Sequence, residues 1–354
     1  MPGDQAGARE LGIGQALISV GIIANPASGK DIRRLVAHGS VFDNDEKVSI
    51  VRRVLLGLEA VGVERVWIMP DSFGIGHKAL DPLKLQLDAS LLSMPKTFSQ
   101  EDSRRAAKLM GAGGARCLVT LGGDGTNRIV AKASDQVPLM PISTGTNNVF
   151  PSMIEASIAG LAAGLVACGQ ADEAVYRAPR LDVIGTTASQ GDAEACVSDI
   201  ALVDAAVYAE RFIASRAIWD AAKIKEVVLT RVEPGNVGLS AIGSHLLGGE
   251  TPPETGLYLR MEPGTHGKQV LAPIAPGLIR WINVVEHQLL TPGDEVEISH
   301  AEACVLALDG ERELELRPGS SLRLRLNANG PKVIHARQAI EIAARAGAFV
   351  QRGV

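Results

Sequence analysis

The sequence predicts an α/β protein in which an N-terminal doubly wound parallel α/β domain is followed by a mainly antiparallel β-sandwich domain. Up to about residue 150, apolar runs that suit buried strands alternate with runs of helical periodicity, as in β-α-β units. Past Gly169, short strand-like runs separated by Gly and Pro replace the helical ones, and some alternate in period two. A length of 354 residues also favours two domains.

These changes of pattern place the domain boundaries. We expect a disordered tail at residues 1–15, the α/β domain at 16–150, the β domain at 151–335 and a C-terminal helix within 336–354. The net charge of −5 argues against a nucleic-acid surface, and the longest weakly charged stretch is too short to span a bilayer. We expect a cytoplasmic homo-oligomer whose other partners are small molecules rather than nucleic acid or membranes.

The elements of the α/β domain are predicted as follows. The first strand, 17–24, ends in the turn NPASGKD, and a helix with apolar residues at 3–4 spacing covers 45–61. A second strand at 65–69 leads into PDSFGIGHKAL, for which we expect a flexible loop over a binding site; the alternative is a plain surface loop. Ser99 caps a helix that runs to about Met110, and a third strand occupies 116–121.

The β domain is expected to consist of short strands. They are predicted at 176–184, 195–207, 224–232, 256–261, 270–274, 281–285, 295–298, 303–308, 311–316 and 322–326. Asp309 and Gly310 lie between two of these runs and suit a hairpin turn. A short helix at 338–350 closes the chain.

Two Gly- and Thr-rich turns are the most informative stretches. They occur in LVTLGGDGTNR (118–128) and PLMPISTGTNNVFP (138–151), each after an apolar strand-like run and before a helical one. In an open parallel sheet such turns lie at the carboxyl edge, where ligands bind. Gly122, Gly123 and Gly125 allow a close backbone approach, and the amides that open the next helix suit a phosphate.

Asp124 is the unusual member of the first turn. A carboxylate among phosphate-binding amides repels the ligand unless it handles a proton or a metal ion. The alternative is that Asp124 caps a helix beginning near Asn127, since Asp is a favoured N-cap. The two glycines before Asp124, and the second turn one strand later, favour the functional interpretation.

The turn NPASGKD is a weaker candidate site. It is not a P-loop, because the first glycine of that motif would fall at Ala24 and Asp31 follows the Gly-Lys pair. Asn25 nevertheless lies at the carboxyl end of the first strand, where a phosphate contact is possible. The alternative is a plain Pro/Gly turn.

GGDGT followed by a second turn of the GTGND type resembles the superfamily of NAD kinases, diacylglycerol kinases and sphingosine kinases. The resemblance extends from about Gly21 to Lys332 and includes NPASGK, ALVDAAV (201–207) and LALDGERELEL (306–316). The nearest likeness is to the NAD-kinase-like acetoin-catabolism protein X group. Val203 stands where NAD kinases have Asn, and Gly277 where they have His, so the acceptor side departs from the NAD kinase pattern.

The resemblance implies an NAD kinase-like fold and an ATP-dependent kinase that uses Mg²⁺. Asp124 would be the base that accepts a hydroxyl proton, or would orient Mg²⁺ through water. Asp204 would bind an acceptor hydroxyl, the alternative being a solvent-facing residue. The residues implied to bind nucleotide are Asn25, Gly122, Gly123, Gly125, Thr126, Asn127, Thr144, Gly145, Thr146 and Asn147.

Three functions from different classes fit these patterns. The first is a small-molecule kinase that phosphorylates a hydroxyl of a nucleotide-like or polyol acceptor. The second is a lipid kinase of the diacylglycerol type, which would need a large exposed apolar patch. The third is a nucleotide-binding regulator that kept the fold and lost catalysis.

Overall fold

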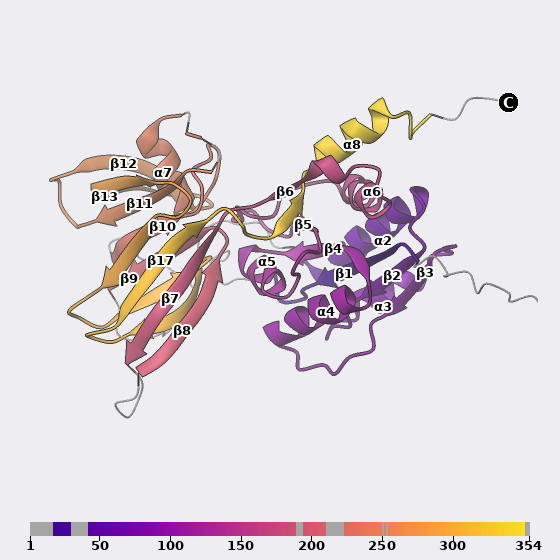
Figure 1. Cartoon of the computed structure of the whole chain (residues 1–354), viewed down its shortest axis with the longest axis horizontal. Coiled ribbons are helices and arrows are strands. Elements are labelled where there is room, and N and C mark those ends of the chain that lie inside the picture. Colours follow the sequence, from indigo (N-terminus) through magenta and orange to yellow (C-terminus); the bar gives the residue numbers. More distant parts are fainter. Residues whose placement is uncertain are drawn as a thin grey trace, which may run out of the picture.

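The computed structural model describes residues 17–29, 42–188, 194–209, 223–249, 251–252 and 254–350, so the tail predicted at 1–15 lies outside the described residues. Three sheets form within these ranges, one in the α/β domain and two in the β domain (Figure 1). No helix in the described ranges is long and apolar enough to cross a bilayer.

The α/β domain is built on one sheet whose first six strands are parallel, with only the last strand antiparallel. The strands lie in the order β3-β2-β1-β4-β5-β18-β6. Their bounds are β1 Ser19–Ala24, β2 Arg65–Ile68, β3 Asp88–Leu91, β4 Ala115–Gly122, β5 Leu139–Ser143, β6 Val175–Arg177 and β18 Lys332–Ile334.

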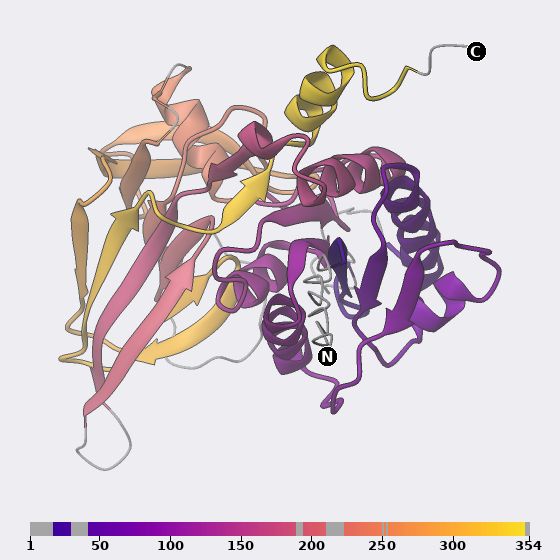
Figure 2. The same cartoon turned by 45° about the vertical axis from the view of Figure 1, so that its right-hand side comes forward.

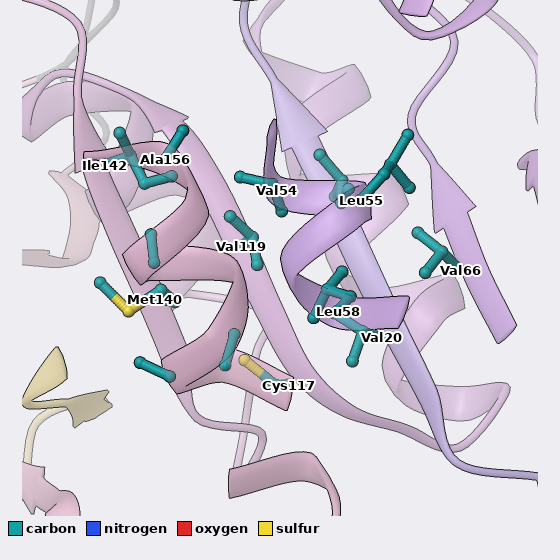
Figure 3. Close-up of a cluster of buried hydrophobic side chains, with 14 of the residues drawn as sticks. Val20, Val54, Leu55, Leu58, Val66, Cys117, Val119, Met140, Ile142 and Ala156 are labelled. Carbon is teal, nitrogen blue, oxygen red and sulfur yellow. The ribbon is translucent and has the colours of Figure 1, made fainter. Parts of the chain in front are cut away.

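Helices cover both faces of this sheet, which confirms the doubly wound prediction. One face packs against α2 (Asn44–Ala60), α6 (Ala156–Ala167) and α8 (Ala336–Arg345), and the other against α4 (Gln100–Ala112) and α5 (Asp124–Ala131). In the first core, Val54 and Leu58 of α2 lie beside Val119 and Val20 of the strands (Figure 3).

Three local predictions differ from the structure. The segment predicted as a loop contains α3 (Ile75–Leu80), because Asp71 accepts hydrogen bonds from the Phe73 and Ile75 amides and starts the helix. The boundary at residue 150 is also wrong, since α6, β6 and β18 complete the first sheet and its core (Figure 2). The β domain begins near residue 180 and contains one helix in its described part, α7 (Ser240–Leu247).

The β domain is an antiparallel sandwich. One sheet has the order β12-β13-β11-β10-β9-β15-β16 and the other β14-β17-β7-β8, and apolar side chains of β7 and β17 face those of β9 and β15. The bounds are β7 Arg180–Ala188, β8 Glu194–Ala201, β9 Asp204–Tyr208, β10 Ile224–Leu229, β11 Gly256–Met261, β12 Lys268–Ala275, β13 Leu278–Leu290, β14 Glu295–Ser299, β15 Cys304–Leu308, β16 Glu311–Leu316 and β17 Ser321–Asn327.

Gly160 brings α6 into direct contact with α2. A Cβ at this position would overlap the carbonyl oxygen of Val54, and backbone cannot move aside as a side-chain tip can. We expect Gly160→Ala to lower the free energy of unfolding by about 1–3 kcal/mol, measured by urea denaturation. Gly111→Ala on α4 is the matched control, because its Cβ would meet only Val137 at 3.6 Å, and it is expected to be neutral or stabilising. Equal stability of the two variants would contradict this packing account.

Candidate active site

A cleft of about 860 Å³ lies between the two domains. The α/β domain contributes its first strand end and both Gly- and Thr-rich turns, and the β domain contributes the starts of β9 and β16 and the segment before α7. Helix α5 lies on the side of the α/β domain that faces the β domain (Figure 1). The predicted residues that line the cleft are Asn25, Gly123, Asp124, Gly125, Thr126, Thr146, Asn147 and Asp204.

Asp124 joins the two turns. It is the first residue of α5, and its carboxylate accepts hydrogen bonds from the amides of Val149 (3.1 Å) and Phe150 (2.8 Å) in the second turn. The interpretation of Asp124 as a helix cap is wrong, because Gly123 holds the N-cap position and makes no side-chain cap bond. The carboxylate is therefore fixed in the cleft by the neighbouring turn rather than by its own helix.

The pKa of Asp124 is raised to about 7, mainly because burial disfavours the charged carboxylate. The negative charge of Asp309 raises this pKa further, whereas the Phe150 and Val149 amides and the positive charge of Arg231 lower it. A carboxyl group with a pKa near neutrality can accept a proton from a substrate hydroxyl and release it again at physiological pH.

Asp309 is a second buried carboxylate at the same end of the cleft. It forms the predicted hairpin turn with Gly310, at a φ of 52°, and accepts hydrogen bonds from the amides of Val203 (2.7 Å) and Leu202 (3.0 Å). Burial raises its pKa to about 6, although the nearby Arg128 guanidinium lowers it. This carboxylate holds the turn in front of β9 in place, so the Asp-Gly pair is more than a hairpin connection.

Arg128 links α5 to the β domain. Its side chain is fully buried, with Nε 3.6 Å from Asp309 Oδ2 and Nη1 3.5 Å from Asp199 Oδ1. Lys132, one turn further along, also pairs with Asp199. The helix that carries Asp124 is thus bound to two carboxylates of the second domain.

Asp204 lies at the start of β9 and lines the cleft, and it is only 8% exposed. The interpretation of Asp204 as a solvent-facing residue is therefore wrong. Its neighbour Val203 is buried in an apolar cluster with Phe150 and Leu202. The position where NAD kinases have Asn is thus part of a hydrophobic contact between the domains.

Four predicted nucleotide-binding residues do not line the cleft: Gly122, Asn127, Thr144 and Gly145. The Asn127 side chain is fully buried, accepts a hydrogen bond from Thr120 and donates one to the Gly123 carbonyl (2.9 Å). The Thr144 hydroxyl lies 3.0 Å from that of Ser28. The side chains of Asn127 and Thr144 therefore shape the turns from behind, and direct nucleotide contact by these four residues stays a prediction.

The turn that follows the first strand, residues 25–28, is also part of the site. The Asn25 amide donates to the Thr126 hydroxyl at 2.9 Å, which connects the NPAS turn to the start of α5. Lys47 of α2, for which the sequence carries no local signal, is buried beneath this turn and donates to the carbonyl oxygens of Asn25 (2.9 Å) and Ser28 (2.6 Å).

Glu311 reaches across the cleft from the β domain. Its Oε2 accepts a hydrogen bond from Gln100 at the start of α4 (2.8 Å), and a Cβ on Gly125 would lie 2.5 Å from its Oε1. Gly125 is thus required for a close approach of this carboxylate to the first turn of α5. The sequence offered no local signal for the contact, because Glu311 occupies an ordinary strand position.

The cleft is strongly acidic. Its described lining residues include six carboxylates and no Lys, Arg or His; the six are Asp71, Asp102, Asp124, Asp204, Asp309 and Glu311. Within the described residues no group of three or more His, Cys, Asp or Glu side chains is arranged to hold a metal ion. A nucleoside triphosphate would have to bind together with a cation, because its phosphates and these carboxylates are both negatively charged and repel each other.

Comparison with known proteins identifies the class of the two domains. Residues 20–171 match the ATP-NAD kinase N-terminal domain, and residues 183–329 match the acetoin catabolism protein X C-terminal domain. The chain is thus an NAD kinase-like two-domain protein. Acetoin catabolism protein X of Cupriavidus necator is 37% identical over 335 residues, which cover 92% of this chain and 90% of that protein. The chain belongs to the acetoin catabolism protein X family.

Two similar solved structures are kinases. Yeast NADH kinase, complexed with NADH, is 15% identical with a TM-score of 0.49, and the match covers 96% of this chain and 90% of that one. An NAD kinase from Archaeoglobus fulgidus, in complex with ATP, is 14% identical with a TM-score of 0.42, and the match covers 94% and 100%.

Proposed function

We propose that the protein is a kinase that transfers the γ-phosphoryl group of ATP to a hydroxyl of a nucleotide-like acceptor. The observation that supports this most is Asp124, a carboxylate with a near-neutral pKa at the start of α5, inside the cleft between the domains. The acetoin catabolism protein X family also supports a role in acetoin catabolism. A cytoplasmic location and a homo-oligomeric state stay predictions.

The reaction is assigned to residues as follows. Asp124 accepts the proton of the acceptor hydroxyl, whose oxygen forms a bond to the γ-phosphorus as the bond to the leaving ADP oxygen breaks. The donor phosphates would bind at the amides that open α5, with Thr126 and Asn25 beside them. Asp204 accepts a hydrogen bond from the acceptor.

Mg²⁺ fits this site as a companion of the nucleotide rather than as a resident ion. It is usually held by one or two carboxylates together with substrate phosphates, so a complete protein cage is not needed. With Asp124 acting as the base, Asp204, which also lines the cleft, is the residue that would hold the ion. When bound, the ion neutralises phosphate charge, which this acidic cleft requires.

The acceptor is proposed to differ from NAD. Val203 packs into the apolar cluster with Phe150 and offers the acceptor no side-chain hydrogen bond. Turnover is tested by measuring ADP release from ATP and Mg²⁺ with NAD, NADH, other nucleotides and polyols as acceptors. We expect acceptor-dependent release, with NAD among the poorer acceptors. ATP binding without turnover on any acceptor would favour the nucleotide-binding regulator instead.

A further inference from the structure

The cleft extends past the residues that the proposed reaction uses. The strands of the first sheet lie in the order β3-β2-β1-β4, and Asp124 follows β4. The cleft lining continues along this edge of the sheet to Phe73, after β2, and to Phe98, after β3. Neighbouring strands lie about 4.8 Å apart, so this arm of the cleft spans about 14 Å between β4 and β3. The reaction assigned above gives its two phenylalanine rings no role.

Phe98 presents the more open of the two rings. It is 66% exposed, although Nζ of Lys96 lies 5.9 Å from the centre of its ring. Phe73 is half-buried, and Nζ of Lys78 lies 3.4 Å from its ring centre, so one face of that ring is covered. An exposed aromatic ring in the lining of a cleft leaves apolar surface available to a ligand.

The backbone holds Phe98 in a conformation that is unfavourable for phenylalanine. Its φ is 56°, in the left-handed region that bulky side chains rarely adopt. Asp102, which is only 5% exposed, fixes this conformation by accepting hydrogen bonds from the amides of Phe98 (2.7 Å) and Thr97 (2.8 Å). Glycine would adopt the same φ without strain. Because an exposed ring contributes little burial, the stability of the fold does not account for a phenylalanine here, whereas contact with a ligand does.

Phe98 is also connected to the proposed phosphate site. Gln100, two residues further on, donates to Glu311 at 2.8 Å, and the Glu311 carboxylate lies against Gly125 at the start of α5. Two residues of backbone span at most about 7 Å. A nucleotide whose phosphates bind at the amides that open α5 therefore has its base within reach of Phe98, along the same cleft.

We propose that Phe98 is the surface on which the aromatic base of that nucleotide stacks. This inference rests on the proposed kinase function, because it identifies where the base of the phosphate-bearing ligand binds. Stacking requires a planar ring but does not select one base, since every base has a π-face. The base belongs either to ATP or to a nucleotide-like acceptor, and the two sources share this chemistry. Asp102 is then a positioning residue, which holds the ring towards the cleft.

The test measures ligand binding by isothermal titration calorimetry with the full chain, using ATP with Mg²⁺, NAD, and inorganic triphosphate with Mg²⁺ as separate probes. Phe98→Gly removes the ring and suits the local φ. It is expected to bind a base-containing probe about 5- to 150-fold more weakly, since stacking on an aromatic side chain typically contributes about 1–3 kcal/mol per base. Binding of triphosphate, which has no base, should not change.

Three further variants control this measurement. Phe98→Tyr keeps an aromatic ring and should bind all probes about as well as wild type. Phe98→Asn is a second variant without a ring, because Asn also tolerates a positive φ, and it should behave like Phe98→Gly. Phe349→Gly removes a phenylalanine that is 45% exposed and lies outside the cleft lining, and it should bind like wild type. Melting temperatures establish that each variant is folded.

The pattern of losses decides the outcome. Weaker binding of ATP alone assigns the base to the donor, weaker binding of NAD alone assigns it to the acceptor, and weaker binding of both supports a shared stacking surface. Equal losses for ATP and triphosphate, or nucleotide binding that is unchanged in Phe98→Gly and Phe98→Asn, would overturn this inference alone. A wild-type protein that binds neither nucleotide would overturn both proposals. A Phe98 effect on binding without turnover on any acceptor would contradict only the kinase function.

Discussion

Asp124→Asn is expected to lower turnover at least about a hundredfold while the fold remains intact, since loss of a general base typically costs 10²–10⁴ in rate. The Asn side chain keeps the shape and one oxygen to accept the Val149 and Phe150 amides, but it has no useful basicity. Binding of ATP should persist or tighten, because a negative charge near the phosphates is removed. Turnover is measured with the acceptor found by the ADP-release screen.

The melting temperature of Asp124→Asn is the control that distinguishes a loss of catalysis from a loss of folding. The pKa of Asp124 is raised in the folded state, so its contribution to stability is full below the ordinary pKa of Asp and is lost as the pH rises towards 7. Asp124→Asn removes this titration and should melt at the same temperature as wild type, or higher, at pH 8. Near-normal turnover in a folded Asn variant would refute the catalytic role of Asp124.

Arg128→Met is expected to destabilise the protein by about 3–5 kcal/mol, the usual cost of leaving a buried charge without its partner. Asp309 and Asp199 would both lose the guanidinium group. Because Arg128 lowers the pKa of Asp309, its removal raises that pKa further. The loss should therefore be larger at pH 8, where Asp309 must ionise, than at pH 5, where it can stay protonated.

Urea denaturation at both pH values measures this effect. The matched control is Arg180→Met, which removes a partly exposed arginine paired with Asp182 and should cost no more than about 1 kcal/mol. A small, pH-independent loss for Arg128→Met would show that the buried ion pairs do not hold α5 to the β domain.

The sequence predicted most of the fold where the relevant pattern is local. Helix α4 begins after Ser99 as expected, because an N-cap residue and the acidic residues after it are adjacent in the chain. Strand β3 was missed, since its residues are mostly exposed and show no apolar run. The place of β18 could not be predicted, because a three-residue strand pairs with a partner far away in the sequence.

The residues of the candidate site were likewise predictable where the pattern is local and not where it depends on distant contacts. The Gly- and Thr-rich turns could be found, since glycines before a helix start are a local signature. The sequence could not predict which side chains of a turn face the cleft. Those of Asn127 and Thr144 face the interior of the protein instead. Arg128 and Glu311 reach the neighbourhood of Asp124 only through contacts between the domains, for which a single sequence has no signal.

The position of β18 has a consequence for how the chain is made. Strand β6 joins the first sheet only through β18, and β18 is synthesised after the whole β domain. While the ribosome is still producing the β domain, Ser152 can already bridge to Ile142 of β5, but Leu139 lacks the partner that β18 supplies in the finished sheet. A chain that stops before residue 332 would leave the Leu139 part of the β5 edge open to pairing with other chains. Residues translated after the β domain therefore complete a domain whose first strands were translated before it.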